Sequence, residues 1–322
     1  MATTAATRTA TAPGPGSRAR RWLGAFRERD TWWAYGFLSP WIFGFVVFTA
    51  GPMIASAVLS FTDYSIVAPS HSVGLANYRA VASDPYLLLS LKNTLEMTAM
   101  YVPTEMILAL ILASMLARIT RFDGFFRTIF YLPVMTPTVA IGSMYLLMFN
   151  GPYGLVDQFL HILHLPQPYW LTDPHWIKRG ITAMLVWQVG GNTVLYLAAI
   201  KNVPQHLYEA ASIDGASAWR RFKDVTLPMI SPTLFFTFII LTIYGLQVFD
   251  QIYTAFYNPS NAKISSDTSL MYVIYLFQQA FSYLHMGFAS AMAWLLFGII
   301  MVITAVQILV SRRLVYYEGE TK

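Results

Sequence analysis

Long apolar runs restrict the fold of this chain more than any other feature of its sequence. A helix needs about 20 mostly apolar residues to cross the hydrocarbon core of a bilayer. Six segments meet this requirement: 35–59, 91–116, 126–149, 181–201, 230–253 and 287–310. Only 11% of the 322 residues are charged, whereas soluble domains carry about 25%. The sequence therefore predicts an all-α fold, a polytopic membrane helix bundle with six transmembrane helices.

Several of these segments contain residues that interrupt a regular helix. Prolines occur within the first three, as Pro40, Pro52, Pro103, Pro133 and Pro137. The fourth segment is less apolar because it carries Gln188, Gly190, Gly191 and Asn192. A membrane helix tolerates proline when its neighbours satisfy the freed carbonyl groups. We therefore expect a packed bundle rather than isolated helices surrounded by lipid.

The positions of Lys and Arg predict the orientation of the bundle. Cytoplasmic segments of membrane proteins carry an excess of these residues. If the N-terminus is inside, 16 of the 21 Lys and Arg residues lie on the inner side and 5 on the outer side. We predict that both termini are cytoplasmic (N-in/C-in), with a disordered tail at 1–30, a transmembrane domain at 31–313 and a second tail at 314–322. The segment 203–228 then lies in the cytoplasm.

Few residues could carry catalytic or metal chemistry. The chain has no cysteine, which excludes disulfides and thiolate metal sites. His161 and His164 have a spacing that metal ligands can show, but no cluster of carboxylates accompanies them. The sequence contains no nucleophile–base pattern and no Gly-x-x-x-x-Gly-Lys-Ser/Thr phosphate loop. We expect no metal site and no enzymatic activity.

An organised polar segment at 209–228 separates the fourth and fifth apolar segments. Pro204 favours the start of a short helix at Gln205–Ile213, and Gly215 can end it in a left-handed conformation. Ser217 is a candidate N-cap of a second helix, which Pro228 would end. Two short helices joined at a glycine would form a knob below the membrane. The alternative is an amphipathic loop whose basic residues only satisfy the positive-inside bias.

The order of residues in this segment carries a resemblance to a known family. Glu209-Ala210-Ala211, Gly215-Ala216, Phe222, Val225 and Leu227-Pro228 have the spacing of the EAA loop of ABC importer permeases. The stretches 74–78, 92–94, 249–253 and 286–291 resemble the larger sugar-permease subunit of the maltose-type class. One stretch departs from that family, because 256–259 lacks the glycine pair of its usual Thr-x-Gly-Gly-Pro turn.

The resemblance implies a type I ABC importer permease fold in the inner (cytoplasmic) membrane. The chain would form half of a sugar path, and a second related permease subunit would form the other half. Two ATPase subunits or domains would bind ATP and Mg²⁺, so this chain would need no cofactor, and a substrate-binding protein would dock outside. Lipid surrounds such a chain, and nucleic acid is no partner. The implied ATPase-coupling residues of the 203–228 loop are Tyr208, Glu209, Ala210, Ala211, Asp214, Gly215, Ala216, Phe222, Leu227 and Pro228.

Polar and aromatic residues inside the spans are candidates for the substrate path. Such residues are costly in lipid and tend to face a cavity, and aromatic rings with amides suit sugar rings. The candidates are Trp187, Gln188, Asn192, Tyr196, Tyr244, Gln247, Asp250 and Gln251. The residues at 244, 247 and 251 would share a helix face. Alternatively, the aromatic residues form interfacial belts and the amides join helices.

Other functions stay open at this point. The substrate could be glycerol phosphate, a polyol or another small solute. A phosphate-bearing substrate should require basic residues in the path, and the spans contain almost none. A proton-coupled secondary transporter would need titratable groups near the midplane, where Glu105 is the candidate. A membrane scaffold would bind partners without moving a substrate.

Overall fold

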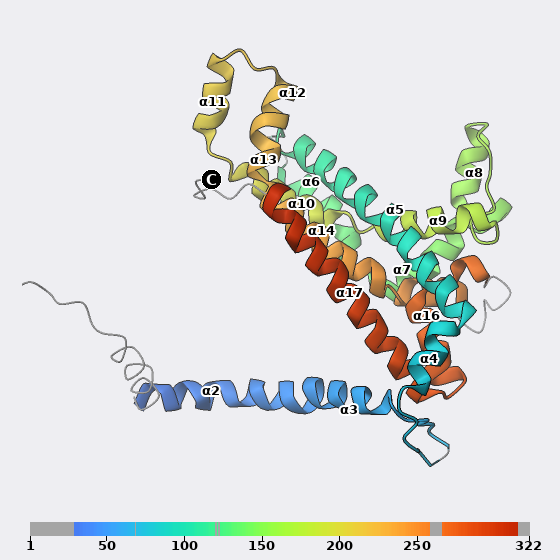
Figure 1. Cartoon of the computed structure of the whole chain (residues 1–322). Coiled ribbons are helices and arrows are strands. Elements are labelled where there is room, and N and C mark those ends of the chain that lie inside the picture. Colours follow the sequence, from blue (N-terminus) through green and yellow to red (C-terminus); the bar gives the residue numbers. More distant parts are fainter. Residues whose placement is uncertain (1–28, 68, 120, 122, 258–265, 315–322) are drawn as a thin grey trace, which may run out of the picture. The chain divides into compact units, whose positions relative to one another are not determined.

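The structure, a computed structural model, describes residues 29–67, 69–119, 121, 123–257 and 266–314. The predicted tails at 1–30 and 314–322 lie almost entirely outside these residues, as does part of the stretch 256–259. Within the described residues the regular structure is helical (Figure 1), apart from an isolated β-bridge between Thr62 and Ser72. The predicted all-α fold is confirmed.

The elements follow one another with short connections. The α-helices are α2 (Arg29–Phe45), α3 (Gly51–Leu59), α4 (Ala76–Ser83), α5 (Pro85–Leu116), α6 (Asp123–Tyr131), α7 (Thr138–Met148), α8 (Leu155–Ile162), α9 (Pro174–Val186), α10 (Gly190–Lys201), α11 (Gln205–Ile213), α12 (Ala218–Arg221), α13 (Leu227–Met229), α14 (Ser231–Gln247), α15 (Asp250–Ile252), α16 (Tyr272–Phe277) and α17 (Met286–Leu314). The π turns are η1 (Val46–Ala50), η4 (Phe222–Thr226), η5 (Tyr253–Tyr257) and η8 (Gln278–Ser282). The 3-10 turns are η2 (Leu132–Met135), η3 (Gly151–Tyr153) and η7 (Asp267–Ser269).

Residues 1–58 form one unit, to which α2, η1 and most of α3 belong. These elements make a single apolar run of 28 residues, Trp32–Leu59. Pro52 is the second residue of α3, two positions after η1 ends, and a π turn is one of the distortions that let a helix accommodate a missing N–H. Large apolar side chains such as Phe37 and Phe48 are exposed along the run. A helix that is apolar on all sides belongs in lipid or in a core.

The second unit, residues 59–322, contains the remaining spans. Three helical runs are long and apolar enough to cross a bilayer: Pro85–Leu116, Ser231–Tyr257 and Met286–Ser311. Two further pairs of helices meet the same criteria together but are bent, by 95° between Gly124–Met135 and Thr138–Met148 and by 56° between Pro174–Val186 and Gly190–Lys201. The described chain thus has four long spans, or up to six if each bent pair is one span.

The third, fourth and fifth spans differ from the continuous helices that we expected. Pro133 lies in the 3-10 turn η2, and Pro137 precedes α7 in an extended conformation, so the third span breaks between them. The fifth span breaks after α14 because Val248 is extended, with φ −59° and ψ 131°. The predicted common face of 244, 247 and 251 is therefore wrong, since 251 belongs to the separate helix α15.

α5 lies at the centre of the second unit. It contacts α9, α10, α14 and α16, and the side chains of Met97 and Tyr101 on it belong to the largest buried cluster. Further along α5, Ala109 and Ala113 are fully buried and cluster with Tyr196 of α10. Small residues four apart let membrane helices approach closely, and close packing drives their association in lipid. The helices around α5 thus form the packed bundle that the sequence predicted.

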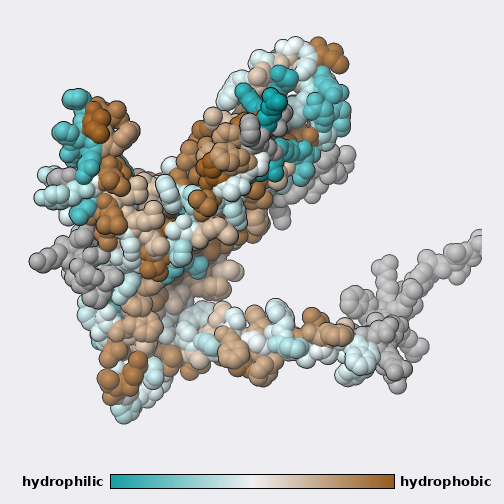
Figure 2. All heavy atoms as spheres, turned by 180° about the vertical axis from the view of Figure 1, so that it is seen from behind, coloured by the Kyte–Doolittle hydropathy of each residue, from teal (hydrophilic) through white to brown (hydrophobic). Residues whose placement is uncertain are grey.

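The polar residues of the second unit gather at its ends. Figure 2 shows hydrophilic residues over the α11–α12 end and over the α8 end, with apolar side chains between them. The connection that contains α8 lies between the third and fourth spans, and the connection that contains α11 and α12 lies between the fourth and fifth. Successive connections of a membrane bundle lie on opposite sides of the bilayer, which agrees with the two polar ends.

Gly190 permits the closest approach between the third and fourth spans. A Cβ atom at Gly190 would lie 1.7 Å from the carbonyl oxygen of Phe130, whereas one at Gly191 would meet nothing closer than 3.8 Å. We predict that Gly190→Ala lowers the unfolding free energy by about 1–3 kcal/mol through overpacking, and that Gly191→Ala does not. Thermal unfolding of both variants in detergent measures the difference. Equal stability of the two variants would contradict this packing.

Candidate functional site

The first half of the polar segment forms the helix that the sequence predicted. α11 spans Gln205–Ile213, with Pro204 at its N-cap. Gly215 has a φ of +73°. Its N–H bonds to the Ser212 carbonyl at 3.1 Å, and the Ala216 N–H bonds to the Ala211 carbonyl at 2.9 Å. This is the Schellman arrangement, which closes a helix when the residue after it is left-handed. The predicted helix and its glycine end are confirmed.

The second half forms a longer helical run than expected. The Ser217 side chain accepts a hydrogen bond from the Arg220 N–H at 3.3 Å, which confirms the N-cap. The run then continues from α12 through the π turn η4 and into α13, which ends at Met229. Pro228 therefore does not end the run, because it lies inside α13, and the predicted end at Pro228 is wrong. The π turn directly before α13 provides the distortion that accommodates a proline without an N–H.

Two side-chain hydrogen bonds tie the two helical runs together. The hydroxyl groups of Tyr208 on α11 and Thr226 on η4 are 2.9 Å apart. The Arg221 guanidinium donates to the Ser212 hydroxyl at 3.0 Å. Together with the Schellman end, these contacts hold the knob, residues 203–228, as one unit. Sequence reasoning missed the roles of Ser212 and Thr226, because their partners lie 9 and 18 residues away.

The end of the knob presents large apolar side chains to solvent. Ile213 is 87% exposed and Trp219 is 71% exposed, and Trp219 stacks on Phe222 at 5.7 Å between ring centroids. Exposed residues among the predicted coupling set are Glu209, Ala210, Asp214 and Gly215. Partly buried ones are Tyr208, Ala211, Ala216, Phe222, Leu227 and Pro228. Exposed Trp and Ile beside polar residues are typical of a surface that binds another protein.

Within the spans, Asn192 meets a buried carboxylate. The Asn192 side chain on α10 donates to Oε1 of Glu105 on α5 at 2.9 Å. Glu105 is 2% exposed, and its Oε2 has no hydrogen-bond partner among the described residues. An unpartnered buried polar atom is costly. The predicted path did not include Glu105, although its depth in the second span made it the candidate for a proton-coupling group.

A second polar contact lies near the break in the fifth span. The Gln251 amide donates to the Tyr244 hydroxyl at 2.7 Å, and the Tyr244 ring lies 6.1 Å from that of Tyr101 on α5. On the other side of the break, Asp250 accepts a hydrogen bond from Thr138 on α7 at 2.9 Å. Gln247 is the last residue of α14 before the break, and it is exposed. The break thus places polar groups of α14 and α15 against α5 and α7.

Two predicted path residues are enclosed in this structure. Tyr196 is fully buried, and its hydroxyl is 2.6 Å from that of Thr237 on α14. It joins two helices here and does not face open space. Gln251 is also buried, and its amide bonds to the Tyr244 hydroxyl.

The remaining candidates lie at the bend of the fourth span. Trp187 is 46% exposed and lines an apolar cavity of about 160 Å³ with Tyr145 and Met148 of α7. The Gln188 amide donates to the Thr136 carbonyl at 3.4 Å. Both residues therefore face the third span. The bend brings them to the junction between α7 and α9.

Comparison with known families gives a match over residues 105–316 to the family described as "Binding-protein-dependent transport system inner membrane component". The chain belongs to this family. The matched region runs from Glu105 on α5 to the end of α17 and includes the whole knob. The match thus covers the second part of α5, the later spans and the knob, whereas the first span, Trp32–Leu59, precedes it.

Individual relatives agree with the family. The probable ABC transporter permease protein YesP of Bacillus subtilis (strain 168) is 34% identical over 91% of this chain and 94% of its own length. The lactose transport system permease protein LacF of Rhizobium radiobacter is 34% identical over 77% of this chain and 85% of its own. A chain in the crystal structure of a bacterial alginate ABC transporter, in complex with an alginate pentasaccharide-bound periplasmic protein, superposes with a TM-score of 0.77.

That solved chain shares 25% sequence identity with this one, and the match covers 89% of this chain and 96% of that chain. Together with the family match, this similarity confirms the predicted type I importer permease fold. The chain is an integral, multi-pass membrane protein and a permease subunit of an ABC importer.

The pair of Asn192 and Glu105 gives a prediction about stability. Asn192→Leu removes the amide that Glu105 accepts from and leaves both carboxylate oxygens without a partner. We expect the unfolding free energy to fall by about 1–3 kcal/mol. Adding Glu105→Leu to this variant should recover part of the loss, since no polar group is then left unpaired. Thermal unfolding of the two single variants and the double variant measures the interaction, and strictly additive losses would contradict it.

Proposed function

We propose that this permease carries an uncharged sugar across the cytoplasmic membrane and is driven by an ATPase that binds its knob. A relative with 34% identity is named for lactose transport, which supports a sugar substrate. The polar groups at the breaks of the fourth and fifth spans include amides and a tyrosine hydroxyl beside the carboxylates of Glu105 and Asp250. Amides and hydroxyls can donate and accept hydrogen bonds as sugar hydroxyls require. A phosphate-bearing substrate would favour Arg or Lys at these places.

The knob is the observation that carries the proposal. It is held by a Schellman end and two cross-helix hydrogen bonds, and its apolar end is exposed. A lever must be stiff to transmit a rigid-body motion, and a binding surface must be open before its partner arrives. Glu209 is exposed and would make a charged contact with the ATPase. Tyr208, Ala211 and Phe222 would support the docking surface, with Gly215 making the sharp turn.

The other members of the complex follow from what this chain lacks and from its family. The sequence has no phosphate-binding loop, so two separate ATPase subunits or domains would bind ATP and Mg²⁺ and hydrolyse the ATP. A second, related permease would complete the path between the two chains. A substrate-binding protein would deliver the sugar to the outer side.

Affinity purification in mild detergent, followed by an ATPase assay, tests the proposal. We predict that the wild-type chain co-purifies with an ATPase and a second permease, and that the combined variant Glu209→Ala/Gly215→Pro loses the ATPase and sugar uptake while still inserting in the membrane. His206→Ala is the matched control, because His206 is an exposed residue of α11 outside the coupling set. Normal uptake by the combined variant would overturn the assignment.

Uptake by the reconstituted complex distinguishes the substrates. Proteoliposomes with a binding protein should accumulate a neutral sugar such as lactose or maltose when ATP is supplied. Accumulation of sn-glycerol-3-phosphate alone would contradict an uncharged substrate. Uptake that stops with an uncoupler while ATP is held constant would contradict ATP as the driving force.

A further inference from the structure

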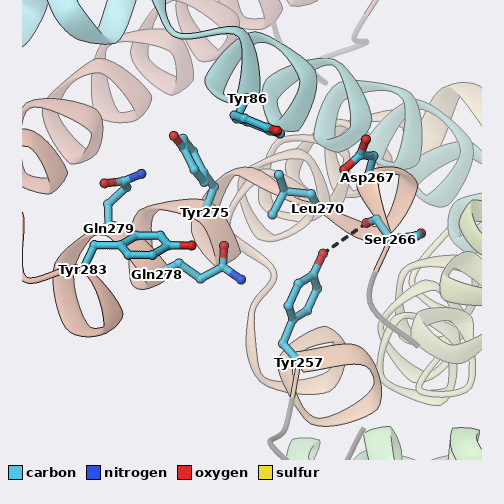
Figure 3. Close-up of a pocket in the computed structure, with 9 residues that line it drawn as sticks. All are labelled: Tyr86, Tyr257, Ser266, Asp267, Leu270, Tyr275, Gln278, Gln279 and Tyr283. Carbon is cyan, nitrogen blue, oxygen red and sulfur yellow. Dashed lines mark hydrogen bonds between the residues drawn. The ribbon is translucent and has the colours of Figure 1, made fainter. Parts of the chain in front are cut away.

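A polar cavity lies at the outer ends of the spans, away from the path candidates. It has a volume of about 510 Å³ and lies between the start of α5, the end of η5, η7 and the α16–η8 segment. In the predicted orientation α5 and α17 begin on the outer side, so the cavity opens there. Figure 3 shows tyrosine and glutamine side chains around it. The volume is in the range of small-molecule sites, about 300–1,000 Å³.

The cavity combines aromatic rings with uncharged hydrogen-bonding groups. Tyr86, Tyr275 and Tyr283 line it together with the amides of Gln278 and Gln279. Asp267 adds a carboxylate, and among the residues that the structure describes no Lys or Arg lines this cavity. Aromatic rings offer an apolar face, and tyrosine adds a hydroxyl at its edge. Amides supply both donors and acceptors. This set suits the CH face and the hydroxyl groups of a sugar.

One side of the cavity is held in place by the fold. The Tyr275 hydroxyl donates to Oδ2 of Asp84 at 2.7 Å, and Oδ1 of Asp84 caps α5 by accepting from the Tyr86 N–H at 2.8 Å. Burial raises the pKa of Tyr275 above its usual range, and the hydrogen bond to the Asp84 carboxylate raises it further. The hydroxyl therefore keeps its proton at neutral pH. The start of α5 and α16 are thereby connected through one carboxylate.

Two tyrosine rings of the cavity are open to a ligand. Tyr86 is 54% exposed and Tyr283 is 58% exposed. The oxygen of the Gln279 amide is 3.0 Å from Nδ1 of His285, and the Gln279 side chain also hydrogen-bonds to the Tyr275 hydroxyl. Gln278 and Gln279 lie in the π turn η8, and π turns occur frequently at functional sites. Gln279 also lines a neighbouring cavity of about 430 Å³, so polar space extends on both sides of it.

We propose that this cavity is an outer binding subsite for an uncharged sugar unit, which the substrate occupies before it enters the path between the spans. The inference rests on the proposed function, because it assigns a site to the same class of substrate. The carboxylate of Asp267 disfavours sugar phosphates and uronates at this subsite. Tyr86 and Tyr283 stack on the ring, and the amide of Gln278 bonds to its hydroxyls.

Binding to the full chain in lipid nanodiscs tests the subsite directly. Saturation-transfer NMR would be recorded with lactose and maltotriose as neutral probes and with galacturonate and sn-glycerol-3-phosphate as anionic ones. We expect the neutral probes to bind and Tyr283→Ala and Gln278→Ala to weaken their binding about tenfold. Tyr169→Ala is the matched control, because Tyr169 is an exposed tyrosine that does not line the cavity.

The outcomes separate the subsite from the proposed function. Unchanged binding of the neutral probes in both cavity variants, no binding of either probe, or equally strong binding of the anions would overturn the subsite. Uptake by the reconstituted complex is measured on the same variants. If ATP-driven uptake of a neutral sugar persists with an unchanged KM while the cavity variants bind like wild type, the subsite is wrong and the importer function stands. If the cavity variants lose binding but the reconstituted complex takes up no sugar, the importer function alone would be contradicted.

Discussion

The hydrocarbon interior of a bilayer offers no water to the peptide backbone, so each N–H and C=O group must be satisfied within the protein. This constraint explains why the described chain is built from helices and why its irregular segments lie where they do. The breaks near Pro133, Gly190 and Val248 are not exposed to lipid on all sides. Gly190 lies directly against the Phe130 carbonyl, and Val248 is buried in the main core. A backbone can leave the helix only where other helices cover it.

The same breaks position several of the polar groups that we predict for the path. A straight fourth or fifth helix would carry Asn192, Tyr244 and Asp250 as isolated polar residues in lipid. In the broken spans they bond to Glu105, Gln251 and Thr138 from neighbouring elements. Outside the spans no such constraint acts, and the knob is shaped instead by a glycine turn and two cross-helix hydrogen bonds. The chain thus joins broken helices within the spans to two helical runs that are bonded to each other outside them.

The sequence was informative where local chemistry decides the structure. The apolar runs located the spans, and the helix at Gln205–Ile213, the left-handed Gly215 and the Ser217 cap followed from residues a few positions apart. It was not informative where contacts join distant residues. The bonds from Tyr208 to Thr226 and from Asn192 to Glu105 depend on how helices pack, and so does the burial of Tyr196. The extended conformation of Val248 has no local signal, which is why a continuous fifth helix was expected.

The central claim is that the knob moves as one rigid unit, and a distance measurement within it tests this most directly. The chain has no native cysteine, so the double variant His206→Cys/Lys223→Cys carries spin labels at these two positions and nowhere else. Both positions are exposed, and each lies on one of the two helical runs. Pulsed electron paramagnetic resonance would then be recorded on the assembled transporter with and without ATP. The account predicts one narrow distance distribution that is the same in both states. A broad distribution, or one that shifts when ATP binds, would contradict it.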